Sequence, residues 1–202
     1  MSLHAVGHRF RSGPWLFRGI DYDFQPGRIY ALTGPSGSGK STLLSILARL
    51  QEPQEGAIDF ADVHRVGWVF QNPFGTPRRS AIDQVALPLL GQGLSVEEAK
   101  QVAHELLTRL GLAELSERPF KNLSGGEAQR LMLARGIAAN PDLLLVDEPT
   151  AQLDRRSAAT VDAVLGSLIG PRRIVIVATH DPKTRDACTD IFTLDEYARS
   201  AD

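Results

Sequence analysis

The sequence predicts an α/β fold in which helices cover both faces of a mainly parallel sheet. Short, continuously apolar segments recur along the chain, and segments with helical spacing separate them. Strands that are apolar at every position are typical of parallel sheets buried on both faces. In addition, a Gly/Ser-rich segment follows the first apolar segment and precedes a Leu-rich one, so it joins a strand to a helix.

Five segments are predicted as strands of this sheet because they are β-branched or Leu-rich and lack polar interruptions. They are residues 29–33, 66–70, 143–146, 174–179 and 191–194.

Helices are predicted between these strands. One follows the Gly/Ser-rich segment, and a second covers 95–111, where apolar residues recur every three or four positions. Ser95 and Glu98 form a capping-box pair at its start, and Gly111 can end it. A further helix through 161–168 is expected to end at Gly170 and Pro171. Since no strand signal appears between about residues 80 and 139, we expect a helical subdomain inserted there.

The composition of the chain excludes several classes of function. The chain has 202 residues, 43% of them hydrophobic, and a net charge of −2, so we expect one domain over residues 1–202. This charge argues against a nucleic acid partner, which needs a basic surface. Cys188 is the single cysteine and cannot form an internal disulfide. No apolar run has the length of a membrane span or a signal peptide, and a cytosolic chain is expected.

The Gly/Ser-rich segment, GPSGSGKST, matches the P-loop pattern G-x-x-x-x-G-K-[ST] in its required strand and helix context. Its glycines let successive backbone N–H groups point at phosphate oxygens, and the following helix N-terminus adds partial positive charge. Lys40 should reach the β- and γ-phosphates, and Ser41 should ligate Mg²⁺. The candidate phosphate-binding residues are Gly34, Pro35, Ser36, Gly37, Ser38, Gly39, Lys40, Ser41 and Thr42.

Two carboxylates end the strand LLLVDE, and Pro149 prevents the strand from continuing. In P-loop proteins such an Asp helps hold Mg²⁺, which assigns Asp147 to the metal. Glu148 is placed to act as a general base on the water that attacks the γ-phosphate.

A second glycine-rich helix start lies in LSGGEAQR. Ser124 and Glu127 form a capping box. The capping box does not explain Gly125 and Gly126, because glycine in a first helical turn costs stability unless a group must approach the backbone closely. We therefore expect this helix N-terminus to face a phosphate as well.

With the P-loop, LSGGEAQR and LLLVDEPT in this order, the chain resembles the ATP-binding subunit of ABC transporters over nearly its whole length. The resemblance implies that ATP and Mg²⁺ are bound between two chains packed head to tail, most simply a homodimer. Ser124, Gly125 and Gly126 of one chain would then reach the γ-phosphate held on Lys40 of the other.

The resemblance also implies further site residues. Gln71 matches the glutamine that senses Mg²⁺ and the attacking water, and His180 matches the histidine that contacts the γ-phosphate. Asp154 matches an aspartate that crosses the dimer interface. No Tyr precedes the P-loop at the distance expected for the adenine-stacking aromatic, so Phe10 is the first candidate and Trp15 the second, since stacking needs only a π-face.

Two departures from the family pattern stand out. Gln152 occupies a position that usually carries a small residue. The segment from Gly56 to Gln71 is short for the family, which predicts a trimmed antiparallel β subdomain.

The partner implied by the resemblance is a transmembrane permease, which would hold the chain at the cytoplasmic face of the cell membrane. Residues 83–90 are similar to the lipoprotein-release, macrolide-efflux and cell-division subgroup. We expect residues 71–80 to dock a permease helix through Phe74, Arg78 and Arg79. A non-transport ATPase that regulates an envelope or cell-division complex is the alternative. The LSGGE segment argues against a nucleotide kinase, and the length argues against a DNA-repair ATPase.

Overall fold

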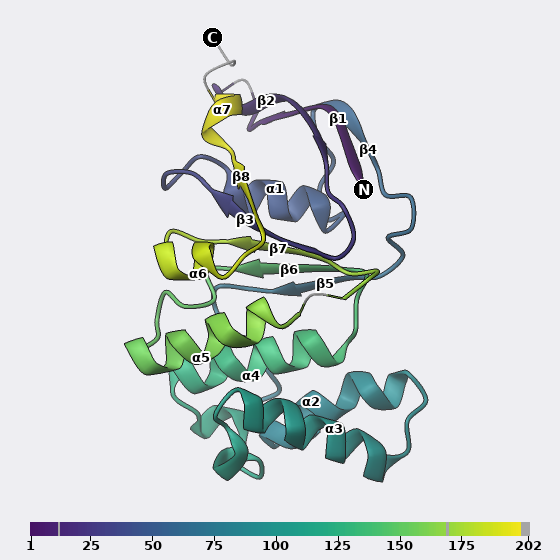
Figure 1. The fold of residues 1–202 in the computed structure, drawn as a ribbon, viewed down its shortest axis with the longest axis vertical. Coiled ribbons are helices and arrows are strands. Elements are labelled where there is room, and N and C mark those ends of the chain that lie inside the picture. The colour runs from purple at the N-terminus through teal and green to yellow at the C-terminus, as the bar shows by residue number, and fades with distance from the viewer. Residues whose placement is uncertain (12, 169, 199–202) are drawn as a thin grey trace.

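A computed structural model describes residues 1–11, 13–168 and 170–198, with a parallel sheet through the middle of the molecule (Figure 1). All four pairs of neighbouring strands in it are parallel. The strand order is β5 (Val66–Val69), β6 (Leu143–Asp147), β7 (Ile174–Ala178), β3 (Arg28–Thr33) and β8 (Asp190–Thr193). Each strand lies on a segment predicted from the sequence, so the predicted sheet is confirmed.

The continuous apolar character of β6 and β7 follows from their position, because every residue in both strands is buried. Successive side chains in a strand point to opposite faces of the sheet. One face receives Leu144, Val146, Val175 and Val177, and the other receives Leu143, Leu145, Ile174 and Ile176. The sheet therefore separates two hydrophobic cores.

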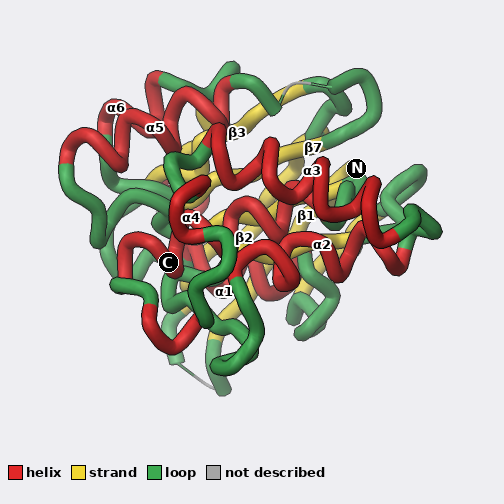
Figure 2. The backbone as a smooth tube through the Cα atoms, turned by 90° about the horizontal axis from the view of Figure 1, so that it is seen from below, coloured by secondary structure: helices red, strands yellow, loops and turns green. Residues whose placement is uncertain are grey.

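Helices cover both faces of the sheet. Helix α1 (Lys40–Leu47) packs on one face, and α4 (Gly125–Ala138) and α5 (Arg155–Gly166) pack on the other (Figure 1). Seen from below, α2 (Ala81–Gly91), α3 (Val96–Arg109) and α4 lie in front of the strands (Figure 2). The predicted helix through 161–168 ends at Gly166, earlier than the expected stop at Gly170 and Pro171.

A second, antiparallel sheet lies beyond α1 (Figure 1). It has the order β2 (Trp15–Asp23), β1 (Ser2–Arg9) and β4 (Glu55–Asp59). Leu3, Val6, Phe17 and Ile20 from this sheet join the core that α1 helps to form. The chain reaches β5 only a few residues after β4, in agreement with the predicted trimmed subdomain.

Between residues 80 and 139 the regular structure is helical, apart from one isolated bridge between Ser80 and Pro119. It comprises α2 (Ala81–Gly91), α3 (Val96–Arg109), the short 3-10 helices η1 (Ala113–Leu115) and η2 (Phe120–Asn122), and α4. Capping boxes begin both α3 and α4, as the sequence predicts.

Two short helices, α6 (Pro182–Asp186) and α7 (Asp195–Ala198), were not predicted. The described part of the chain contains no helix that combines the length and the apolar character needed to span a bilayer.

Candidate functional site

A pocket of about 880 Å³ lies at the carboxyl ends of β3, β6 and β7. Ligands of open α/β sheets bind at this edge. Its lining residues come from the P-loop, from the loops after β5, β6 and β7, and from the end of β1 and the start of β2. They are Phe10, Leu16, Ser36, Gly37, Gly39, Lys40, Ser41, Thr42, Gln71, Asp147, Glu148, Thr150, Ala151, Leu153, His180, Asp181 and Pro182.

The P-loop turns sharply into α1 at Gly39, which has a φ of +96°. The backbone angle favours glycine, and a Cβ atom at this position would also lie tightly against the ring of Phe17, at 3.1 Å. Gly39 caps α1 without a side-chain hydrogen bond. The first N–H groups of the helix are therefore available to an anion in the pocket.

Lys40 lies across the loop, buried at 7% exposure. Its Nζ donates hydrogen bonds to the carbonyl oxygens of Gly34, at 2.8 Å, and Pro35, at 3.1 Å. Burial lowers the pKa of Lys40, although Glu148, Asp147 and Asp195 act against this shift. Gly34, Pro35 and Ser38 shape the loop without lining the pocket.

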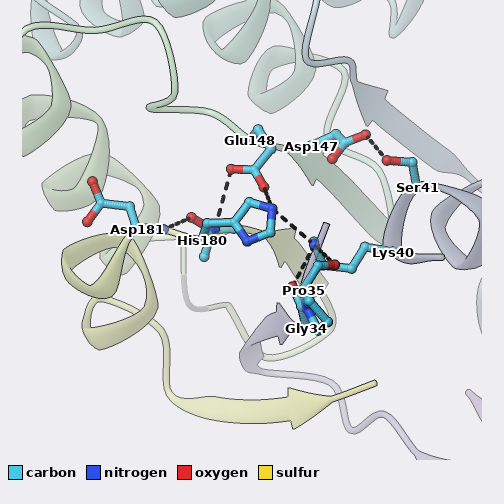
Figure 3. A network of polar contacts seen from close by, with 9 residues as sticks. Gly34, Pro35, Lys40, Ser41, Asp147, Glu148, His180 and Asp181 are labelled. Carbon is cyan, nitrogen blue, oxygen red and sulfur yellow. Dashed lines mark hydrogen bonds and ion pairs between the residues drawn. The ribbon is translucent and has the colours of Figure 1, made fainter. Parts of the chain in front are cut away.

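Asp147 ends β6 beside the first turn of α1, where Ser41 Oγ donates to its Oδ2 at 2.9 Å (Figure 3). Burial raises the pKa of Asp147, opposed by the hydrogen bond from Ser41 and by the charge of Lys40. No group of three or more His, Cys, Asp or Glu side chains able to hold a metal occurs among the described residues. A hydroxyl next to one carboxylate fits Mg²⁺, because this ion keeps several waters and takes substrate phosphates as further ligands.

Glu148 follows with a φ of +46°, in the left-handed region that is unfavourable for a residue with a Cβ atom. Its Oε1 lies 3.2 Å from His180 Nε2, and its Oε2 accepts a hydrogen bond from the His180 backbone N–H at 3.4 Å (Figure 3). Burial is the main factor that raises the pKa of Glu148, and the charge of His180 opposes it. A raised pKa suits a carboxylate that accepts a proton near neutral pH.

His180 Nε2 lies close to two side chains. It is 3.2 Å from Glu148 Oε1 and 3.1 Å from Lys40 Nζ. Nε2 can accept from Lys40 only when the ring proton is on Nδ1, and it can donate to Glu148 only when Nε2 carries the proton. The tautomer of the neutral His180 ring thus decides whether Nε2 interacts with the lysine or with the carboxylate.

Gln71 is exposed and follows β5. It lines the main pocket and also a smaller adjoining hollow together with Ser41 and Asp147. The structure thus places the glutamine beside the candidate metal ligands.

The two aromatic candidates for adenine stacking differ in their surroundings. Phe10 lines the pocket, is 58% exposed and makes an edge contact with His8, with ring centroids 5.3 Å apart. Trp15 is not part of the pocket lining, and the guanidinium groups of Arg9 and Arg18 lie 4.6 and 4.7 Å from its ring centroid. The structure therefore favours Phe10, whose ring is accessible from the pocket.

Besides Gly34, Pro35 and Ser38 of the P-loop, four predicted site residues do not line this pocket: Ser124, Gly125, Gly126 and Asp154. The Ser124 side chain accepts from the Glu127 N–H at 3.3 Å, and Glu127 accepts from the Ser124 N–H at 2.8 Å. Asp154 caps α5 by accepting from the N–H groups of Arg156 and Ser157. A Cβ on Gly126 would lie 3.0 Å from Leu153 Cδ2, and one on Gly125 would lie 3.5 Å from Gln152 Oε1.

Six pocket residues were not predicted: Leu16, Thr150, Ala151, Leu153, Asp181 and Pro182. All six lie within three residues of a predicted residue along the chain, and this proximity was the available signal. The placement of β2 beside the P-loop brings Leu16, rather than the predicted Trp15, to the pocket.

Comparisons with known proteins agree with this site. The family model described as ABC transporter matches residues 17–151. The lipoprotein-releasing system ATP-binding protein LolD of Hahella chejuensis is 35% identical over 212 residues, which cover 96% of this chain and 91% of LolD. An uncharacterized ABC transporter ATP-binding protein of Mycobacterium tuberculosis is 38% identical over 201 residues, 91% of this chain, and the match spans 61% of that relative's length.

Among solved structures, the ATP-binding cassette MJ0796, in a dimeric post-hydrolysis state with ADP and Pi, superposes with a TM-score of 0.81 at 30% identity. The match covers 95% of this chain and 93% of that chain. The chain therefore belongs to the ABC transporter family, as an ATP-binding ATPase domain.

Proposed function

We propose that the chain binds MgATP in the pocket at the end of the parallel sheet and hydrolyses it between two copies of itself, thereby driving a membrane permease. The observation that carries this proposal is the convergence of Lys40, the Ser41–Asp147 pair and the Glu148–His180 pair on one cavity. These groups come from three separate strand ends.

Phosphate binding rests on the P-loop. The backbone N–H groups at the start of α1 bind the α- and β-phosphates, and Lys40 exchanges its bonds to the Gly34 and Pro35 carbonyls for contacts with the β- and γ-phosphates. Phe10 stacks on the adenine. Ser41, Asp147 and Gln71 would hold Mg²⁺, which would neutralise charge on the phosphate oxygens.

Glu148 is the general base. Its raised pKa makes the carboxylate a better proton acceptor from the attacking water, and the His180 N–H fixes one of its oxygens. His180 orients Glu148 and the γ-phosphate, since its Nε2 lies between Lys40 and the carboxylate.

A second copy of the chain completes the site. Ser124, Gly125 and Gly126 lie outside the pocket of their own chain, so they can contact a γ-phosphate only when another chain brings its pocket to them. The dimeric structures of MJ0796 support this arrangement. Asp154 and Gln152 would then lie at the interface.

The permease is expected to dock in a neighbouring groove of about 390 Å³, between β5, the loop after it, α2 and α4. Phe74, 82% exposed, lines this groove with Trp68 and Leu87. Arg78 and Arg79, which we expected to contribute charge, are not part of the lining, and Arg135 is the basic residue there. The docking residues are therefore Phe74 and Arg135, and the similarity to LolD favours a role in export or envelope mechanics.

The test is Glu148→Gln. This change removes the base and preserves the P-loop, so ATP binding should persist while hydrolysis slows by about 10²-fold or more. With ATP and Mg²⁺ the variant should elute as a dimer in size-exclusion chromatography.

Lys40→Ala serves as the control and should abolish both ATP binding and dimer formation. A Glu148→Gln chain with normal turnover that stays monomeric with ATP would refute the proposal.

A further inference from the structure

A second cavity, of about 780 Å³, lies at the amino ends of the parallel strands, on the edge of the sheet opposite the nucleotide pocket. The segments before β5, β6 and β7 form it together with the end of α3 and the turn after α5. These amino ends lie on the right of the sheet in Figure 1. A volume of this size is typical of sites for small ligands.

Four arginines line this cavity: Arg65, Arg109, Arg172 and Arg173. In the described part of the chain, none of their guanidinium groups lies within 4.0 Å of a carboxylate. The whole chain has a net charge of −2, so this concentration of positive charge is local.

Asn140 holds two of these arginines beside each other. Arg65 Nη2 donates to its backbone carbonyl at 2.9 Å, and Arg173 Nη2 donates to its side-chain oxygen. Asn140 has a φ of +46°, a left-handed conformation that asparagine tolerates better than most residues. Asn140 therefore holds the positive charges of Arg65 and Arg173 near each other. This arrangement is favourable when an anion lies between the two guanidinium groups.

The two acidic residues of the cavity, Asp62 and Asp142, offset only part of the charge of its four arginines, so the lining stays net positive. Asp142 Oδ2 already accepts the backbone N–H groups of His64, at 3.0 Å, and Arg65, at 2.8 Å. Although burial opposes the shift, these hydrogen bonds and the charge of Arg65 lower the pKa of Asp142. Asp62 is exposed at the rim. Burial also lowers the pKa of Arg173, which shows that its charge is poorly solvated.

We propose that this cavity is a binding site for a phosphorylated ligand, with Arg65, Arg172 and Arg173 as its phosphate-binding groups. Planar guanidinium groups bind phosphate oxygens in pairs, and three of them around one cavity match a diphosphate better than a single phosphate. The site is separate from the ATP pocket, and its occupancy does not depend on the proposed function.

Inorganic pyrophosphate is the probe, titrated into the full chain by calorimetry with saturating ADP, which keeps the P-loop occupied. We expect saturable binding that becomes about tenfold weaker or more when Arg65→Gln and Arg172→Gln are combined. Both side chains are exposed, so these changes should leave the fold intact. Arg118→Gln, an exposed arginine outside the cavity, is the matched control and should bind as the wild type does.

Amide NMR shifts locate the binding. Shifts at Asn140, Asp142 and Arg173 support the site, whereas shifts confined to 34–42 overturn it. Equal binding by the double variant, or an effect that sodium chloride of the same ionic strength reproduces, also overturns it. Binding to vesicles containing phosphatidic acid without binding of pyrophosphate would identify the phosphate source as a lipid headgroup.

Discussion

Two glycine-rich turns begin helices in this chain, and they differ in how the helix N-terminus is satisfied. At α1, Gly39 is the cap and no side chain bonds to the first N–H groups, which face the pocket. At α4, Ser124 and Glu127 form a complete capping box outside the pocket. The first N-terminus is open within its own chain, and the second is capped and directed elsewhere.

Helix α3 provides a comparison for the start of α4, because it has the same cap and no proposed ligand. It begins with the same capping box, formed by Ser95 and Glu98, but Val96 and Glu97 occupy the two positions that are glycine in α4. The capping box is therefore a structural feature shared by both helices. Packing within the chain accounts in part for Gly126, because a Cβ there would lie 3.0 Å from Leu153 Cδ2, whereas a Cβ on Gly125 would meet only an ordinary contact at 3.5 Å. Gly125 is therefore the glycine that supports close approach of a second chain.

The largest expected effect comes from Ser124→Arg. A bulky cation at this turn should prevent the second chain from closing on the nucleotide, and turnover should fall by about 10³-fold or more, since groups supplied by a partner can be worth ~10³–10⁵ in rate. Nucleotide binding by the monomer should stay near normal in equilibrium dialysis, because the P-loop is untouched.

Ser95→Arg is the matched control for this prediction. It removes the corresponding cap from α3 and should leave turnover nearly unchanged. Loss of ATP binding by the isolated Ser124→Arg monomer would contradict the distinction between the two glycine-rich turns.

A smaller effect is expected from a change in the nucleotide pocket itself, into which the N-terminus of α1 opens. Phe10→Ala removes the accessible ring from the pocket and should weaken ATP binding about tenfold, since stacking on an aromatic is worth ~1–3 kcal/mol per base. Phe10→Tyr should bind nearly as the wild type does. Trp15→Ala should have less effect than Phe10→Ala in the same fluorescence titration, and the reverse order would assign the adenine to Trp15.

The buried carboxylates of the pocket give a prediction for stability and pH. Because the pKa of Glu148 is raised on folding, the folded chain holds more protons than the unfolded one between the two pKa values, and the free energy of unfolding falls as pH rises through that window. Glu148→Gln removes this dependence. Without nucleotide its Tm should exceed that of the wild type by a few degrees at pH 7, and the difference should shrink toward pH 4 in calorimetry.

The sequence was sufficient for the parallel sheet, because β6 and β7 are buried on both faces and this burial produces continuous apolar runs. The antiparallel strands left no such signal. Strand β1 changes register three times against β2, and Ala5 has a φ of +48°, so its apolar residues do not alternate regularly.

The candidate site was predictable where chemistry is local in sequence, as at Lys40 and Asp147. It was not predictable where tertiary packing determines which residues line a pocket. The arginines on either side of Trp15 come from β1 and β2, and only the pairing of these strands brings them together to favour Phe10. Likewise, the pairing of residues 77–81 with 118–121 leaves Arg78 and Arg79 outside the groove that holds Phe74.

The smallest effect is expected from replacing each capping serine by alanine. This pair of variants distinguishes the structural role that both capping boxes share from the functional role proposed for Ser124 alone. Ser124→Ala and Ser95→Ala each remove the side-chain acceptor of the capping box in helices of the same length, so each should lower the free energy of unfolding by about 1 kcal/mol in urea titrations. Ser95→Ala also removes the hydrogen bond that Ser95 Oγ donates to Glu98 Oε2 at 2.6 Å. Only Ser124→Ala should also reduce turnover, because its hydroxyl is the one expected to reach the γ-phosphate of the second chain. The size of that reduction, measured at equal folded fraction, reports the contact across the dimer without the steric block that arginine introduces. Equal turnover in the two alanine variants would mean that the Ser124 hydroxyl only caps α4, and contact with the partner's nucleotide would then rest on the backbone of Gly125 and Gly126.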